Sequence, residues 1–133
     1  MNLKRLGKYS DWAPLLLRLA LGAVFIVHGS QKLFGGIAGT TAFFGSAGIP
    51  LAALFAWVVA LVEFLGGITL VLGVLTRYAS LLLAINMLVA LLVVHLKNGF
   101  SVSNGGFEFV LVLLAGTLAL LIRGPGKIAI QKE

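Results

Sequence analysis

Two ionisable side chains lie deep inside the long apolar runs of this sequence. Arg18 is in the first run and Glu63 is near the middle of the second. An unpaired charge at a membrane-helix centre costs about 2.5–3.5 kcal/mol, so both need partners. One interpretation is a buried Arg18–Glu63 ion pair that fixes helix register, because their axial offset of about 9 Å is within reach of a long arginine. The other is that Glu63 anchors a polar cavity or relays protons, and the spacing leaves both open.

A second group gathers where the first apolar run ends. The stretch FIVHGSQKLFGG places His28 and Lys32 there, and His95 and Glu108 reach a similar height from later runs. Carboxylates near imidazoles and an ammonium under an apolar cover suit a quinone headgroup, a small anion or a proton relay. We therefore expect a ligand site of His28, Lys32, Glu63, His95 and Glu108, with Glu63 and His28 as catalytic candidates. A packing role for His28 and an interfacial role for His95 are the alternatives.

The composition predicts which kind of scaffold holds these side chains. Of 133 residues, 60% are hydrophobic and 11% charged, far from the balance of soluble domains. The mean hydropathy is +1.11. Runs of about 20 apolar residues cross a bilayer, and backbone groups in lipid must be paired, so helices are predicted. We expect one all-α domain over residues 1–133, a bundle of four transmembrane helices at 12–34, 51–75, 78–96 and 105–122.

Charge placement predicts the orientation of this bundle. Lys and Arg collect on the cytoplasmic side of membrane proteins. One side of the predicted topology carries seven basic residues and the other only Lys32 and Lys97, so both termini should be cytoplasmic and the protein should lie in the cell inner membrane. The seven are Lys4, Arg5, Lys8, Arg77, Arg123, Lys127 and Lys132. The net charge of +6 reflects this asymmetry and does not indicate nucleic-acid binding.

Small residues predict how the helices pack and how they are connected. Ala56, Ala60, Glu63 and Gly67 fall on one helical face, which should meet another helix. Residues 35–50 are too apolar for an open loop and too rich in glycine for a span. This segment is expected to be a loop that lies in the membrane interface or re-enters the bundle like a lid.

Several classes of chemistry do not fit the residues. The chain has no cysteine, which excludes a disulfide-forming enzyme acting alone. His28 and His95, the only histidine pair, lie at unequal depths and do not suit a b-type haem. Glu-x-x-His repeats for a di-iron site do not occur, so no metal site is predicted. The first run is longer than a signal-peptide core and is expected to be retained as a span.

The ordered motifs resemble the DoxX family of small bacterial membrane proteins over about residues 14–127. The matching segments are RLALGAVFIVHGSQKLFG, FFGSAGIP, ALVEFLGGITLVLGVLTRYAS and GGFEFVLVLLAGTLALLIRGPGK. Residues that match the family pattern are Arg18, Gly22, His28, Gly29, Lys32, Gly48, Pro50, Glu63, Gly66, Gly67, Gly73, Gly106, Glu108, Gly124, Pro125 and Gly126. The chain departs from it by continuing KIAIQKE where relatives often have a short acidic tail.

The resemblance implies a four-helix inner-membrane protein tied to redox work. Similar proteins include subunits linked to thiosulfate oxidation with quinone as acceptor, and components grouped with oxidative-stress enzymes. The first hypothesis is thus a membrane subunit that engages quinone or a small anionic solute beside a redox-enzyme partner. If catalytic, it would be a quinone-linked oxidoreductase subunit. The alternatives are a non-enzymatic scaffold whose polar residues only specify packing, and a small-solute transporter working as a homodimer.

Overall fold

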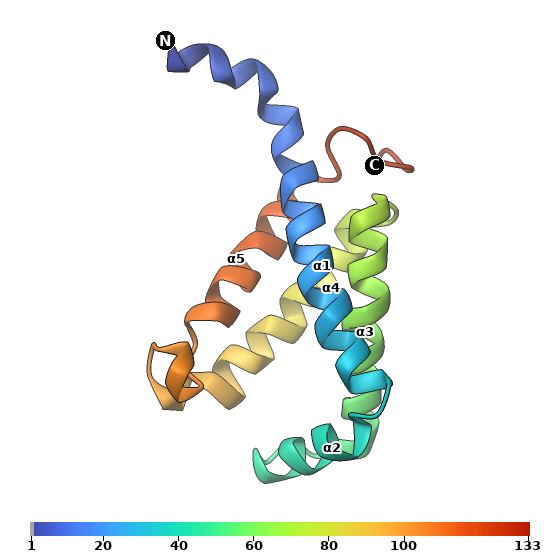
Figure 1. Cartoon of the computed structure of the whole chain (residues 1–133), viewed down its shortest axis with the longest axis vertical. Coiled ribbons are helices and arrows are strands. Elements are labelled where there is room, and N and C mark those ends of the chain that lie inside the picture. The colour runs from blue at the N-terminus through green and yellow to red at the C-terminus, as the bar shows by residue number, and fades with distance from the viewer. Residues whose placement is uncertain (1) are drawn as a thin grey trace.

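The computed structural model describes residues 2–133, and this part of the chain is helical without strands. Figure 1 shows its arrangement. The described residues form five α-helices: α1 (Ala13–Leu33), α2 (Ile37–Ser46), α3 (Ala52–Leu72), α4 (Thr76–Val89) and α5 (Glu108–Arg123). A 3₁₀ segment, η1 (Leu3–Trp12), precedes α1, and α4 continues through the π-helical turn η2 (Ala90–His95) and the short 3₁₀ turn η3 (Leu96–Asn98). A further 3₁₀ turn, η4 (Val102–Asn104), lies before α5. The all-helical prediction is confirmed.

Three of these helical stretches are long and apolar enough to cross a membrane. They are Leu3–Leu33, Ala52–Leu72 and Thr76–Asn98. Helix α5 has 16 residues and begins at Glu108, three residues later than the predicted fourth span. The difference arises because Gly105 has a φ of 70° and Gly106 packs against the backbone of the preceding loop, where a Cβ would lie 2.5 Å from the carbonyl oxygen of Gly99. A left-handed residue and such close packing fix residues 105–107 in the loop.

Helices α1 and α3 pack closely because glycines remove side chains from their contact. A Cβ on Gly29 would lie 2.4 Å from the backbone nitrogen of Phe64, and one on Gly67 would lie 2.7 Å from that of Ile26. Ala56 and Ala60 on the same face of α3 are fully buried. The predicted small-residue face of the second span is therefore confirmed, and it carries Glu63 into the interior.

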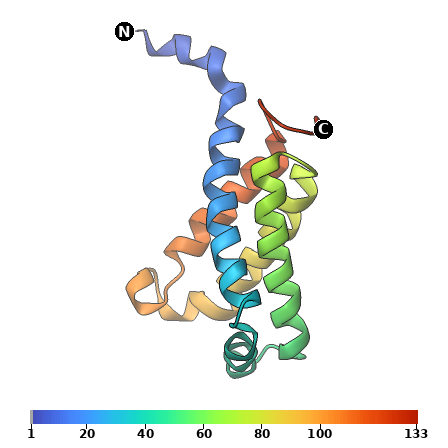
Figure 2. The ribbon, with the colours of Figure 1, turned by 45° about the vertical axis from the view of Figure 1, so that its right-hand side comes forward.

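The segment between α1 and α3 is more regular than predicted. Instead of an irregular glycine-rich loop, it contains the ten-residue helix α2. Gly36 precedes this helix, and Gly48, with a φ of 82°, follows it. These glycines therefore lie at the two ends of this helix and do not interrupt it. Figures 1 and 2 show α2 lying across one end of the bundle, where Phe44 is buried.

The two ends of the bundle differ in what they contain. Both ends of the chain and the short α3–α4 turn lie at one end, and α2 and the loop before α5 lie at the other (Figure 1). The predicted cluster of seven basic residues therefore gathers at the end that holds the termini. We call this the basic end, and we call the end with α2 the α2 end.

Candidate functional site

A cavity of about 580 Å³ lies at the α2 end of the bundle. Residues from α1, α2, α3, α4, η2 and α5 line it. Its wall is mainly apolar and includes Phe25, Phe43, Phe44, Met87 and Phe109. Its polar side chains are His28, Lys32, Thr40, Glu63, Asn86 and His95. A largely apolar hollow with a few converging polar groups is the usual form of a small-molecule site.

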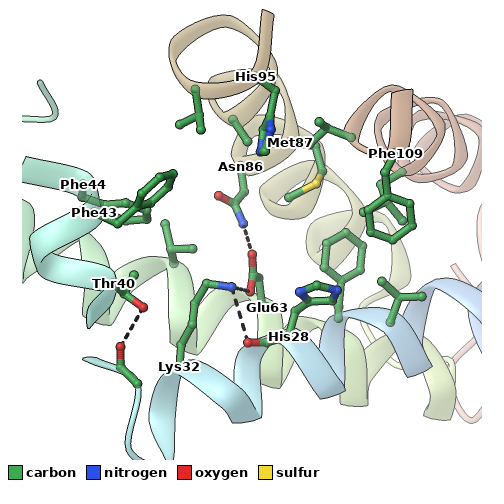
Figure 3. A pocket seen from close by; sticks show the side chains of 18 of the residues that line it. His28, Lys32, Thr40, Phe43, Phe44, Glu63, Asn86, Met87, His95 and Phe109 are labelled. Carbon is green, nitrogen blue, oxygen red and sulfur yellow. Dashed lines mark hydrogen bonds and ion pairs between the residues drawn. The ribbon is translucent and has the colours of Figure 1, made fainter. Parts of the chain in front are cut away.

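Glu63 lies at the centre of the polar groups. The Lys32 ammonium donates to Glu63 Oε2 at 2.6 Å, and the Asn86 amide donates to Glu63 Oε1 at 3.2 Å (Figure 3). The side chains of Lys32 and Glu63 are 21% and 6% exposed, so this ion pair is largely removed from water. Three helices thus meet at one carboxylate, and each of its oxygens accepts one hydrogen bond within the described chain.

Glycine packing positions this cluster. Gly29 lets α1 approach the backbone of α3 at Phe64, the residue after Glu63. One turn beyond Gly29, Lys32 is carried across the same contact to the carboxylate. A side chain at position 29 would separate the helices, so the short Lys32–Glu63 distance depends on a residue without a Cβ.

Arg18 does not form the predicted ion pair with Glu63. Its guanidinium donates instead to the backbone carbonyls of Lys127 and Ile128, at 3.2 and 2.8 Å. The chain beyond α5 folds back over the basic end and brings these carbonyls to Arg18, whereas Lys32 is already beside Glu63 at the other end. The ion-pair prediction is wrong because the partners of Arg18 lie in the tail after α5, outside the apolar runs from which the pair was predicted.

The two histidines occupy different parts of the cavity wall. The His28 ring lies in α1 with its centroid 6.1 Å from that of Phe109. His95, at the end of η2, places Nδ1 2.7 Å from the carbonyl oxygen of Gly105. If Nδ1 donates to this carbonyl, Nε2 carries a free lone pair. His95 also lines a second, smaller cavity of about 190 Å³, so it stands between the two hollows.

The structure brings together four of the five predicted ligand residues. His28, Lys32, Glu63 and His95 line the cavity. Glu108 is not among the cavity-lining residues of the described chain; it begins α5, and its backbone N–H donates to the carbonyl of Phe100 at 2.9 Å. The next residue, Phe109, faces the cavity instead (Figure 3).

Sequence reasoning missed Asn86, which contacts Glu63 directly. It is a lone amide in the apolar stretch LLLAINMLVALLVV, and its polarity in such a run was the available signal. Thr40 was also missed, because residues 35–50 were expected to be a loop. Its hydroxyl donates at 2.8 Å to the carbonyl of Gly36, the residue before α2.

The cluster offers a ligand both donors and acceptors without a net charge. Among residues 2–133, the Lys32 ammonium contacts Glu63 Oε2 and, more weakly, the His28 carbonyl at 3.4 Å. An ammonium has three donors and an amide has two, so each of Lys32 and Asn86 retains one for a ligand. Because Glu63 neutralises Lys32 and would repel a second negative charge, the site suits a neutral ligand with hydrogen-bonding oxygens better than an anion.

Comparisons with known proteins identify the family of this chain. The DoxX family profile matches residues 13–96. A Bacillus subtilis protein named "Putative oxidoreductase CatD" is 38% identical over 115 residues, covering 86% of this chain and 83% of the relative. The Escherichia coli inner membrane protein YqjF is 31% identical, covering 94% of each chain, and the uncharacterized Mycobacterium tuberculosis membrane protein Rv3486 is 31% identical, covering 90% and 79%. No solved structure matches significantly. The apolar helices, the profile and these relatives show that the chain is a membrane protein of the DoxX family.

Proposed function

We propose that this DoxX protein is the membrane subunit of a redox system and that its cavity binds a quinone headgroup. The observation that carries the proposal is the Lys32–Glu63–Asn86 cluster inside a largely apolar cavity of about 580 Å³. Quinone carbonyls accept hydrogen bonds, which Lys32 and Asn86 can donate, and the hydroxyls of the reduced quinol donate to carboxylate oxygens such as those of Glu63.

The apolar part of the cavity suits the rest of such a ligand. Phe25, Met87 and Phe109 line the same cavity as His28, and their surfaces can pack against a flat ring. Reduction of a quinone takes two electrons and two protons. The two electrons would come from a redox partner subunit, and the two protons would come from solvent by way of titratable side chains in the cavity wall such as Glu63 and His28. The oxidoreductase name of the Bacillus subtilis relative supports a redox setting for the family.

The proposal places four spans in the membrane with both termini on the cytoplasmic side. Helix α5 would be the fourth span, at about 24 Å for its 16 residues, slightly short of the hydrocarbon core. The gathering of the basic residues at the end that holds both termini supports this orientation.

Because the chain has no cysteine, single cysteines at Ser103 and Lys132 can be labelled in intact cells. We expect labelling of the cysteine at Ser103 and none of the cysteine at Lys132. Labelling at Lys132 alone would contradict the orientation.

Binding to purified protein tests the ligand. A short-tailed benzoquinone or naphthoquinone, titrated by calorimetry into delipidated protein in detergent, should bind saturably to the wild type. Asn86→Leu removes the donor that remains for a ligand, together with the one to Glu63, without changing the charge. The lost hydrogen bond to the ligand, about 1–1.5 kcal/mol, corresponds to about tenfold weaker binding. Asn104→Leu, an equal change at an exposed residue outside the cavity, is the matched control and should bind like wild type.

Three results would count against the proposal. They are the absence of saturable quinone binding to the wild type, equal affinity in Asn86→Leu, and preferential binding of thiosulfate, which would replace the quinone with an anionic solute. If no ligand binds and a Lys32→Met/Glu63→Leu double variant keeps both its abundance and its function in cells, the polar residues serve packing alone.

A further inference from the structure

The segment before the first span has a three-residue apolar repeat. Leu3, Leu6, Tyr9 and Trp12 recur at every third position of η1, which is a 3₁₀ helix. Such a helix has about three residues per turn, so side chains three apart lie above one another. The four apolar side chains therefore form one continuous ridge, which we call the N-terminal ridge. The basic residues Lys4, Arg5 and Lys8 lie off this ridge.

The N-terminal ridge has no partner within the described chain. Leu3, Leu6, Tyr9 and Trp12 are 61%, 58%, 52% and 42% exposed, and η1 contains no buried residue. Figures 1 and 2 show the segment leaving the top of α1 and bending away from the bundle. A ten-residue stretch with one apolar ridge and basic side chains on both flanks of that ridge is thus presented beyond the end of a membrane-crossing helix.

The junction between η1 and α1 is held firmly. The Asp11 carboxylate pairs with Arg123, and the Asp11 carbonyl accepts a hydrogen bond from the backbone nitrogen of Lys127 at 3.0 Å. A Cβ on Gly126 would lie 2.7 Å from the same carbonyl oxygen. The tail thus fixes Asp11 against the bundle, and the bend that sends η1 sideways begins at an anchored point.

We propose that residues 3–12 dock on the surface of a bilayer that contains anionic lipids. Because η1 leads directly into the first residue of α1, the membrane surface lies where α1 begins, and a segment bent away from the span axis meets that surface along its length. The N-terminal ridge enters the boundary between headgroups and acyl chains, and Trp12 sits at the depth that tryptophan favours. Lys4, Arg5 and Lys8 contact lipid phosphates, and their charge selects an anionic over a zwitterionic surface.

The charge and the composition of residues 3–12 together favour an anionic bilayer as the surface on which they dock. An ammonium or guanidinium near an anionic membrane strengthens docking by about fivefold per residue. Lys8 Nζ lies 4.8 Å from the centroid of the Tyr9 ring, so cation and aromatic group sit side by side as at a membrane interface. The acidic residue of the segment, Asp11, is already neutralised by Arg123 and does not oppose the attraction.

Spin labels on the full-length protein test the proposal. The chain has no native cysteine, so Leu6→Cys reports from the N-terminal ridge and Gly7→Cys from the side facing away. A Cβ at Gly7 meets no atom within 4 Å, which makes this control site tolerant of a label. Each labelled protein is reconstituted in bilayers of phosphatidylcholine alone or mixed with phosphatidylglycerol. Relaxation by oxygen, which concentrates in lipid, is compared with relaxation by a water-soluble nickel chelate.

The expected result is a label at position 6 that is accessible to oxygen in the phosphatidylglycerol bilayers and a label at position 7 that is accessible to nickel. The triple change K4Q/R5Q/K8Q should lower the ratio of docked to undocked segment about a hundredfold in these bilayers. Equal nickel access at both positions, or insertion that is unaffected by lipid charge and by the triple change, would overturn the proposal. Spin–spin broadening between labels at position 6 would also overturn it, since the occupant would then be a second copy of the chain.

Discussion

Two cations are withdrawn from solvent at opposite ends of this bundle, and the chain gives them different partners. Arg18 at the basic end is fully buried and donates to the carbonyls of Lys127 and Ile128. Lys32 at the α2 end is paired with the carboxylate of Glu63 and borders a cavity. The first cation is held by backbone supplied from the tail, and the second by a side chain from another helix.

The two ends also differ in how they are closed, because the tail covers the basic end whereas a cavity lies at the α2 end. At the basic end, the backbone nitrogens of Ile130 and Gln131 donate to the carbonyls of Leu72 and Gly73, so the tail covers the end of α3. Arginine has a planar fork of donors that suits fixed carbonyls, whereas lysine presents a compact ammonium with donors to spare. The carboxylate of Glu63 neutralises Lys32, and both side chains border the cavity.

The largest expected effect comes from separating the Lys32–Glu63 pair. Lys32→Met leaves the carboxylate, whose side chain is 6% exposed, without its cation, and removing one member of a buried pair costs about 3–5 kcal/mol. Glu63→Leu should cost less, because the Lys32 side chain is 21% exposed and can turn towards water. Thermal unfolding of the purified variants in detergent measures both changes.

The double variant Lys32→Met/Glu63→Leu is the control for this asymmetry. With no charge left in the apolar surroundings, it should recover most of the stability that Lys32→Met loses. Additive losses in the double variant would mean that the two side chains act independently. Lys32 and Glu63 would then not form a coupled pair, and the comparison of Lys32 with Arg18 would fail.

A methyl group at Gly29 should have the next largest effect. The new Cβ would lie 2.4 Å from the Phe64 backbone nitrogen, which cannot turn away as a side chain can, so we expect a loss of about 2–3 kcal/mol. At Gly39 in α2, where a Cβ meets nothing within 4 Å, the same change should stabilise the helix by up to about 1 kcal/mol.

Gly22→Ala, near Arg18, tests whether the two ends are packed equally. Its Cβ would meet the Val71 side chain at 2.5 Å and the Gly67 carbonyl at 2.9 Å. One of these neighbours is a side chain, so the loss should be smaller than at Gly29. The same unfolding assay compares the three glycines, and a larger loss at Gly22 would place the tighter contact at the basic end.

The sequence predicted those features that depend on nearby residues. Helical runs follow from hydropathy, and Ala56, Ala60, Glu63 and Gly67 share a face because each residue of a helix advances by about 100°. Depth within the membrane was enough to place His28, Lys32 and His95 in the same half of the bundle, and the structure gathers them around one cavity with Glu63.

Features that depend on chain reversals were not predictable in the same way. The partners of Arg18 are 109 and 110 residues away, in a tail whose sequence gives no helical or strand period. Helix α2 is too short and too rich in glycine to stand out by periodicity. Depth within the membrane alone allowed either Arg18 or Lys32 as the partner of Glu63. Only the packing of Gly29 on α3 brings Lys32 to the carboxylate.

Replacing Arg18 tests the comparison of the two cations at the basic end of the bundle. Arg18→Met removes both hydrogen bonds to the tail without leaving a buried charge, so its loss of about 1–2 kcal/mol should be smaller than that of Lys32→Met. Residues 124–133 should then exchange amide hydrogens and be cleaved by proteases faster. Arg123→Met, which removes an exposed pair with Asp11, should change stability by less than about 1 kcal/mol. An unchanged tail in Arg18→Met would contradict the role of Arg18 as its anchor.

The smallest effect tests how far the tail is distorted in reaching Arg18. Ile128, whose carbonyl accepts from Arg18, has a φ of 49°, a left-handed value that costs a branched residue about 1–2 kcal/mol. Ile128→Gly removes this strain but adds about 0.5–1 kcal/mol of unfolded-chain entropy, so the variant should be slightly more stable and unfold a few degrees higher. Ile130→Gly is matched in exposure, at 73% against 70%, but Ile130 is not among the residues with positive φ. It should therefore lose stability. If both variants lose it equally, no strain is stored at Ile128, and the basic end holds its cation without distorting the tail.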